Sequence, residues 1–307
     1  MTLFFSRRTY NSSNNTFTNN ASTVTRYLSV VGDGPNGGTW RGNMMDQSAW
    51  LTQVSGQLGS NDILLYVHGF NTSQPDMLRR SALIEAGVKR HGFRGAFVAY
   101  DWPSDGSLAK YPSDRRDAKK TAPALVIDGI APLLGLPSRP KIHVIAHSMG
   151  AYLVLRAFSD FGDSIGLGHA GWSTDQVMFA AADVDQAWME KGAWGGLVMN
   201  ERSTRFTDYY NQKDEVLNLS RSFINGRTRA GRSGLPAMLH PKHVDVYCNE
   251  QYKRDVPGAK RTIPYSHRWW FDNDGFFKDV AKTIAGDDEN TMNTRRVTNT
   301  TDLALLT

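Results

Sequence analysis

Short apolar runs alternate with amphipathic stretches along most of this 307-residue chain. The run Ile63-Leu-Leu-Tyr-Val67 has no polar residue, which is typical of a parallel strand buried on both faces. In the segment 76–92, Leu78 and Leu83 fall on one side of a helix and Arg79 on the other. The same reasoning predicts strands over 63–67, 95–100, 142–146, 176–182, 205–210 and 244–248, and helices over 76–92, 115–134, 151–158, 215–223 and 269–284.

Strands that alternate with helices in this way predict an α/β fold, with a mostly parallel central sheet and helices on both faces. We expect a polar N-terminal arm over 1–22, one α/β domain over 23–286 and a polar C-terminal tail over 287–307. The arm is rich in Asn, Ser and Thr, so we expect it to be either poorly ordered or an edge segment.

Composition narrows the class of protein. Hydrophobic residues make up 40% of the chain, enough for a large core, and the single cysteine, Cys248, excludes an intramolecular disulfide. The net charge is +5, but the basic residues are spread in small clusters without a recognition motif, so we expect no nucleic-acid partner. The pattern makes no prediction of the oligomeric state.

Apolar stretches are too short for a membrane span, so we expect no stable membrane insertion. At the start of the chain, apolar residues precede basic ones, which is the reverse of a secretory signal. We therefore expect a soluble, cytoplasmic protein, with a leader removed ahead of this start as the alternative.

The richest local pattern surrounds Ser148. An apolar run stops there, and a helix-forming run starts at Ala151. Ala146-His-Ser-Met-Gly150 nearly matches the G-x-S-x-G nucleophile elbow, with alanine for the first glycine. Small residues are needed on both sides because the strand and helix backbones approach closely, and alanine adds only one methyl group. The pattern predicts that Ser148 is a nucleophile at the N-terminus of a helix.

A base and an acid follow in the order that α/β-hydrolases use. His267 is the histidine that follows the last apolar run, so we expect it to be the general base. Asp214 follows the run 205–210 and is the preferred acid, while Asp183, which follows the preceding run, is the alternative. Asp214 also suits a helix N-cap, and one residue can do both.

Two backbone amides are expected to bind an oxyanion. One belongs to Met149, directly after the nucleophile, and the other to Phe70, in the His-Gly loop 68–73. A plain turn with a capping side chain is the alternative for that loop. Trp102 and Trp269 are candidates to line a substrate pocket, with core packing as their alternative role.

Five segments together resemble a bacterial, esterase- or lipase-like branch of the α/β-hydrolase superfamily that was long catalogued as a domain of unknown function. They are residues 66–73, 100–104, 145–150, 181–185 and 266–270, and the resemblance covers about residues 60–285. It implies serine hydrolase chemistry on carboxylic esters with neither metal nor organic cofactor. It does not supply a substrate.

We therefore expect an esterase that acts on small-molecule esters through an acyl-enzyme. Short to medium acyl chains are favoured because no large apolar lid is visible in the sequence. An amidase or acyltransferase with the same triad is one alternative, and a non-catalytic binding module with this fold is another.

Overall fold

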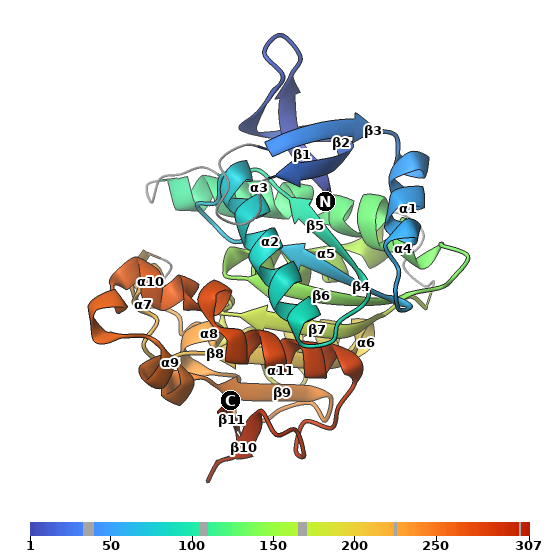
Figure 1. The fold of residues 1–307 in the computed structure, drawn as a ribbon. Helices are drawn as coiled ribbons and strands as arrows, with labels where there is room; N and C mark the ends of the chain where they lie inside the picture. The colour runs from blue at the N-terminus through green and yellow to red at the C-terminus, as the bar shows by residue number, and fades with distance from the viewer. Residues whose placement is uncertain (33–39, 105–109, 165–170, 224–225, 301) are drawn as a thin grey trace.

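The computed structural model describes residues 1–32, 40–104, 110–164, 171–223, 226–300 and 302–307. Its strands form one eleven-stranded sheet in the order β10-β11-β9-β8-β7-β6-β4-β5-β1-β2-β3 (Figure 1). The central strands run parallel, as predicted; they are β4 (Asp62–Val67), β5 (Ala96–Asp101), β6 (Lys141–His147), β7 (Thr174–Ala180), β8 (Ser203–Tyr210) and β9 (His243–Tyr247).

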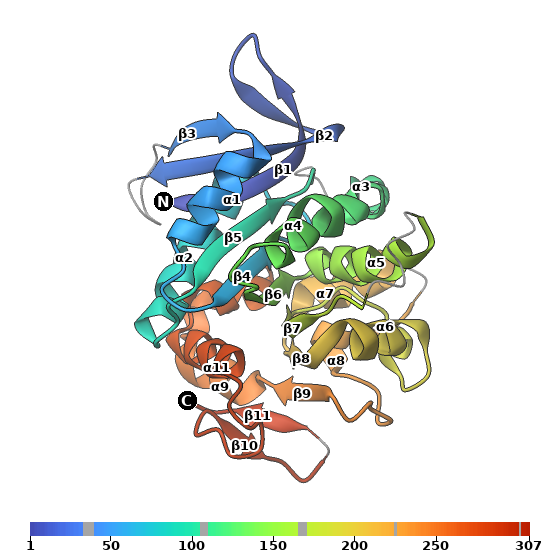
Figure 2. The ribbon, with the colours of Figure 1, turned by 90° about the vertical axis from the view of Figure 1, so that its right-hand side faces the viewer.

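Helices cover both faces of the sheet (Figure 2), which confirms the predicted α/β arrangement. One face carries α1 (Gln47–Gly56), α3 (Tyr111–Ala124), α5 (Met149–Ser164) and α6 (Trp194–Arg202). The other face carries α2 (Gln74–Arg90), α9 (Asn249–Asp255) and α11 (Asp274–Ala285). Strand β4 contributes side chains to the hydrophobic cores on both faces of the sheet, because its side chains alternate. Leu65 packs on one face and Leu64 on the other.

Shorter helices complete the fold. They are α4 (Ala131–Leu134), α7 (Glu215–Phe223), α8 (Ala230–Ser233) and α10 (Ile263–Arg268), with 3₁₀ turns at Gln186–Met189, Gly258–Lys260 and Trp269–Asp272. The single helix expected over 115–134 is instead α3, a π-helical turn (Leu125–Ile130) and α4. Pro123 lies at this break, where its missing N–H and its ring disfavour a regular α-helix.

Of the two forms expected for the N-terminal residues, poorly ordered or an edge segment, the structure shows strands at one edge of the sheet. Strand β1 (Thr2–Asn11) pairs with β5 in parallel and with β2 (Thr16–Gly32) antiparallel, and β2 pairs with β3 (Trp40–Met45). Leu3, Phe4 and Phe5 are fully or almost fully buried, which anchors β1 to the sheet. The Asn- and Ser-rich run is the exposed tip of this hairpin, so its polarity reflects exposure on both sides.

The polar tail expected over 287–307 also joins the sheet. Strand β11 (Leu303–Leu305) pairs with β9 in parallel and with β10 (Arg295–Val297) antiparallel. Its three residues are buried, too short a run to stand out in a polar stretch. In the described part of the chain, none of the helices is long and apolar enough to pass through a bilayer.

Candidate active site

Ser148 stands at a sharp turn between β6 and α5. Its φ is +57°, an unusual value for a residue with a side chain. Its N–H donates to the carbonyl of Ala180 at 3.1 Å, which fixes the turn to the next strand. A Cβ on Gly150 would lie 2.5 Å from the carbonyl oxygen of His68 and 2.6 Å from that of Val67. The turn therefore has the close backbone approach that the sequence motif predicts.

His267, on α10, contacts the carboxylate of Asp214. The distance from His267 Nδ1 to Asp214 Oδ2 is 2.6 Å, and both side chains are buried. Asp214 Oδ1 accepts the N–H of Leu217 at 2.9 Å, so the same residue caps α7. Because the carboxylate accepts the Nδ1 proton, Nε2 is left as the basic nitrogen.

A serine hydroxyl holds α10 beside α7. The N–H of Glu215 donates to Ser266 Oγ at 3.0 Å, and Ser266 Oγ donates to the carbonyl of Ile263 at 2.7 Å. These bonds join the residue after Asp214 to the residue before His267. The acid and the base are therefore positioned by backbone contacts as well as by their own hydrogen bond.

Ser148 and His267 line one pocket of about 280 Å³. Ser148 is 6% exposed and His267 is 7% exposed, so both reach the pocket from a largely buried setting. Among the hydrogen bonds of the described residues, none joins these two side chains. Such contacts commonly tighten only when a substrate binds. The structure thus brings Ser148 and His267 to one pocket, with Asp214 in contact with His267, and the catalytic roles of the three residues stay a prediction.

His147, next to the nucleophile, supports His267. Its Nε2 lies 2.9 Å from the carbonyl oxygen of His267, which accepts the proton, and the two rings are 4.6 Å apart. Burial, followed by the charges of His267 and Arg80, holds the pKa of His147 well below its ordinary value. His147 is therefore neutral, and it contacts the backbone of His267. The sequence indicated only that it packs beside the strand end, because nothing local reveals a contact 120 residues away.

The loop after β4 packs against the elbow. A Cβ on Gly69 would lie 2.8 Å from Ser148 Cβ and 2.9 Å from the carbonyl oxygen of His147. Phe70 follows and lines the pocket, and its N–H makes no hydrogen bond among the described residues. Met149 is the first residue of α5, where a helix offers unpaired N–H groups. Met149 thus follows Ser148 directly, and Phe70 follows the glycine that packs against Ser148; the role of their amides in binding an oxyanion stays a prediction.

The two tryptophans expected at the pocket do not line it. Trp102 is fully buried: its Nε1 donates to the carbonyl of His68 at 2.7 Å, and its ring stacks on the His68 ring at 5.2 Å. Trp102 therefore packs against His68, the first residue of the loop after β4. Trp269 is also fully buried and packs against Tyr252 and Trp270. Core packing, the alternative role, describes both side chains.

Asp183, the alternative acid, binds other partners. Its carboxylate accepts from Ser220 Oγ at 3.0 Å and from the hydroxyl of Tyr111, and it pairs with Arg229 at 3.2 Å. It makes no hydrogen bond or ion pair with His267 in the described part of the chain. Asp214 is therefore the carboxylate in contact with the histidine.

Several residues that line the pocket were not predicted from the sequence. Apolar side chains of α7 and α10 form one wall: Val216, Leu217, Leu219, Ile263 and Pro264. Tyr111, Arg80 and Arg268 form other parts of the lining. The helical pattern of 76–92 placed Arg80 on the polar side, and no signal in the sequence distinguishes it from exposed Arg79.

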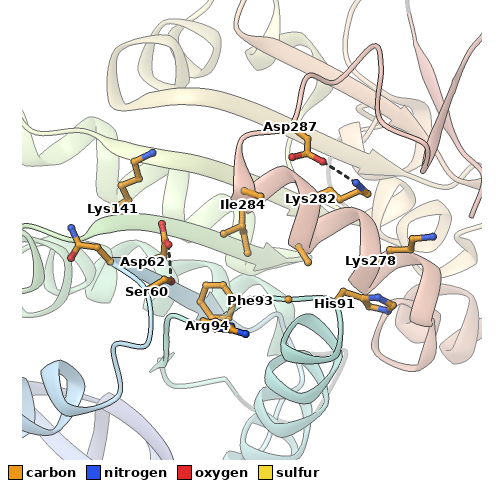
Figure 3. A pocket seen from close by; sticks show the side chains of 14 residues that line it. Ser60, Asp62, His91, Phe93, Arg94, Lys141, Lys278, Lys282, Ile284 and Asp287 are labelled. Atoms are coloured by element: carbon orange, nitrogen blue, oxygen red, sulfur yellow. Dashed lines mark hydrogen bonds and ion pairs between the residues drawn. The ribbon is translucent and has the colours of Figure 1, made fainter.

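A larger pocket of about 620 Å³ lies at the amino ends of the central strands (Figure 3). Asp62 and Lys141, the first residues of β4 and β6, border it, and an ion pair of 2.9 Å joins Lys282 to Asp287. Active sites of open α/β sheets lie beyond the carboxyl ends of the strands, so this larger pocket is not the candidate site. Within the described ranges, no group of three or more His, Cys, Asp or Glu side chains could hold a metal ion.

Comparisons with known proteins bear on this geometry. The family model described as "Alpha/beta hydrolase of unknown function (DUF900)" matches residues 45–238, more than half of the chain. An uncharacterized protein of Nostoc sp., alr1448, is 48% identical over 59 residues. That match spans 19% of this chain and 15% of the Nostoc protein, so it covers well under two thirds of that relative.

Two solved structures illustrate the more distant similarity. Esterase B from Lactobacillus rhamnosis has a TM-score of 0.40 at 8% identity, over 75% of this chain and 77% of the esterase. The Pyrococcus furiosus esterase PF2001 has a TM-score of 0.38 at 14% identity, over 83% of this chain and 86% of the esterase. Both scores are below 0.5, so it is the family match, together with the strand order, that identifies the fold.

Proposed function

This chain belongs to the DUF900 family of α/β hydrolases, and we propose that it is a serine hydrolase that cleaves carboxylic esters with short to medium acyl chains. One observation carries the proposal. The Asp214–His267 pair, 2.6 Å apart, lies at the pocket that Ser148 lines from a strained turn. A nucleophile, a base and an orienting acid in this order are what acyl transfer requires.

In the proposed reaction, Ser148 Oγ bonds to the ester carbonyl carbon while His267 Nε2 accepts the hydroxyl proton. The N–H groups of Phe70 and Met149 donate to the oxyanion that forms. The intermediate collapses, the bond to the alkoxy oxygen breaks, and His267 gives its proton to the leaving alcohol. Water then attacks the acyl-enzyme by the same proton route, which releases the acid and restores Ser148.

Pocket size supports the acyl-chain range. A volume of about 280 Å³ is near the small end of ligand sites, which run from about 300 to 1,000 Å³. Leu217 is buried in the apolar wall, whereas Leu219 and Ile263 are 46% and 50% exposed at its rim. The wall suits a short alkyl chain, and longer chains would extend past the rim into water.

The test is a series of 4-nitrophenyl esters of increasing chain length, run with wild type and Ser148→Ala, together with labelling by a fluorophosphonate probe. We expect labelling of Ser148 and turnover that is greatest for short to medium chains. Loss of Ser148 should reduce kcat about 10⁶-fold. Matched amides and added alcohols distinguish an amidase or an acyltransferase. No labelling and no turnover would leave the binding module as the function.

The acid is tested by comparing two neutral substitutions. Asp214→Asn should lower kcat about 10⁴-fold, because the amide no longer holds the Nδ1 proton on His267. Asp183→Asn should lower kcat much less, because Asp183 contacts Arg229 and Ser220 instead. For this comparison, kcat is calculated from the amount of enzyme that the fluorophosphonate probe labels. A larger loss in Asp183→Asn would contradict the assignment of Asp214.

A further inference from the structure

A buried arginine without a counter-ion lies at the Ser148 pocket. Arg80, on α2, is 6% exposed and lines the pocket. Its Nη1 donates to Thr72 Oγ1 at 2.8 Å, and its Cζ lies 5.3 Å from the centre of the Phe271 ring. No carboxylate in the described ranges forms an ion pair with it. Burying a cation without an anion costs free energy, so an anion bound beside Arg80 would stabilise the guanidinium.

A second guanidinium adds positive charge at the same pocket. Arg268, the residue after His267, also lines it and has no ion pair among the described residues. Partial burial, then the charges of Arg80 and Arg79, lower the pKa of Arg268, although Asp76 and Asp272 act in the opposite direction. Two like charges are therefore held near each other, which is the arrangement that an anionic ligand would stabilise.

Neighbouring carboxylates are bound by other groups. Asp76, the acid nearest in sequence on α2, pairs with Arg79 at 3.2 Å and accepts from Ser73 Oγ at 2.8 Å. Asp183, in the pocket wall, is paired with Arg229, and Asp214 with His267. The charge of Arg80 also acts on Asp76, but without an ion pair, so no carboxylate of the described residues binds the Arg80 guanidinium directly.

We propose that Arg80, with Arg268, binds an anionic oxygen group of the substrate, a carboxylate or a phosphate, beside the ester that Ser148 attacks. The inference rests on the proposed function and defines its substrate class: a small ester that carries a negative charge. Guanidinium groups suit this role because their N–H groups match two oxygens of a carboxylate or phosphate. The apolar wall of α7 and α10 would hold the alkyl part.

Two matched pairs of esters test this proposal. The first compares the mono-4-nitrophenyl ester of adipic acid with 4-nitrophenyl hexanoate, which has the same chain length without the carboxylate. The second compares the phosphate monoester of butyrylglycerol with butyrylglycerol itself. In each pair the readout is the ratio of kcat/KM for the charged ester to that for the neutral ester. Because the ratio is taken within one enzyme sample, the fraction of folded protein cancels.

Wild type should favour the charged member of at least one pair by about ten- to a hundredfold, the range for hydrogen bonds to a charged group. Arg80→Gln should remove most of that preference, and exposed Arg268→Gln should reduce it. Arg79→Gln is the matched control: Arg79 is the adjacent arginine, is paired with Asp76 and is absent from the pocket lining. Its ratio should stay near that of wild type.

Each outcome decides the matter. Preference in the adipate pair indicates a carboxylate, and preference in the glycerol pair a phosphate. Turnover of neutral esters without preference in either pair, or a preference that survives Arg80→Gln, overturns the anionic subsite and leaves the esterase proposal standing. Turnover of no ester, with no fluorophosphonate labelling of Ser148, overturns the proposed function and this inference with it.

Discussion

Two buried carboxyl groups should make the stability of this fold fall as the pH rises. Asp208 on β8 and Asp245 on β9 are register neighbours in adjacent parallel strands, and both are buried. Neither oxygen of Asp208 has a hydrogen-bond partner among the described residues, nor has Oδ1 of Asp245. Burial raises the pKa of Asp208 to about 8, and burial together with Asp208 raises the pKa of Asp245 well above its ordinary value.

The direction and size of the effect follow from proton linkage. In the unfolded chain a carboxyl group ionises near pH 4, whereas in the native state Asp208 keeps its proton up to about pH 8. The native state thus binds more protons than the unfolded chain across this window. The stability that this retained proton contributes is fully present below the pKa of the unfolded carboxyl group. It is lost as the pH rises through the pKa of the native one. Each retained proton changes the free energy of unfolding by about 1.4 kcal/mol per pH unit.

Asp208→Asn should remove one such proton. The amide cannot ionise, and Asp245, its register neighbour, has an Oδ1 without a partner among the described residues. We expect the variant to gain about 1.4 kcal/mol over wild type for every pH unit between roughly pH 5 and pH 8. Urea unfolding followed by tryptophan fluorescence at several pH values measures this difference, and titrating groups remote from the Asp208–Asp245 pair cancel in it.

The double variant Asp208→Asn, Asp245→Asn is the control, and its profile should be at least as flat as that of the single variant. Parallel profiles for wild type and Asp208→Asn over this range would refute the reasoning. They would mean that the native pair does not hold the extra proton.

Two further predictions concern the loop after β4. Gly69→Ala should lower kcat about 10²–10³-fold, because the new methyl group would push this loop, with the Phe70 amide proposed to bind the oxyanion, away from Ser148. Ester turnover measures this loss. Gly56→Ala is the control and should leave kcat unchanged, because its added methyl group meets nothing within 4 Å. Arg8→Met should lower the free energy of unfolding by about 3–5 kcal/mol, because Asp101 would stay buried without its cation. Urea unfolding measures this loss, and a loss below about 1 kcal/mol would contradict the prediction.

The sequence predicted the site best where the signal was local or ordered along the chain. Ser148 could be named as the candidate nucleophile because the elbow needs small residues at fixed positions, and the structure shows the close backbone approach that imposes them. Asp214 and His267 were found because each follows a strand, and parallel strands end at the same edge. These inferences needed only the order of the elements.

The errors arose where burial depends on distant partners. Trp102 follows a strand end as an active-site residue would, yet its ring lies under the loop because His68 stacks on it. Arg80 and Arg79 are consecutive basic residues of one helix, and only the packing of Phe271 shows which of them is buried. The Asn- and Ser-rich start predicted either a poorly ordered arm or an edge segment, and its composition could not distinguish them, because a hairpin that projects from a sheet is exposed on both sides.

The N-terminal strand makes the loop after β4 dependent on residues outside the family match. Arg8, on β1, donates from Nη2 to the carbonyl of Thr72 at 2.8 Å and from Nε to Asp101 at 2.7 Å. Burial alone would raise the pKa of Asp101, but the Arg8 guanidinium holds it below its ordinary value. A charged contact of this kind is strong because both side chains are buried. Strand β1 therefore has a structural reason to remain paired with β5: it fixes one end of the loop whose other end meets Ser148.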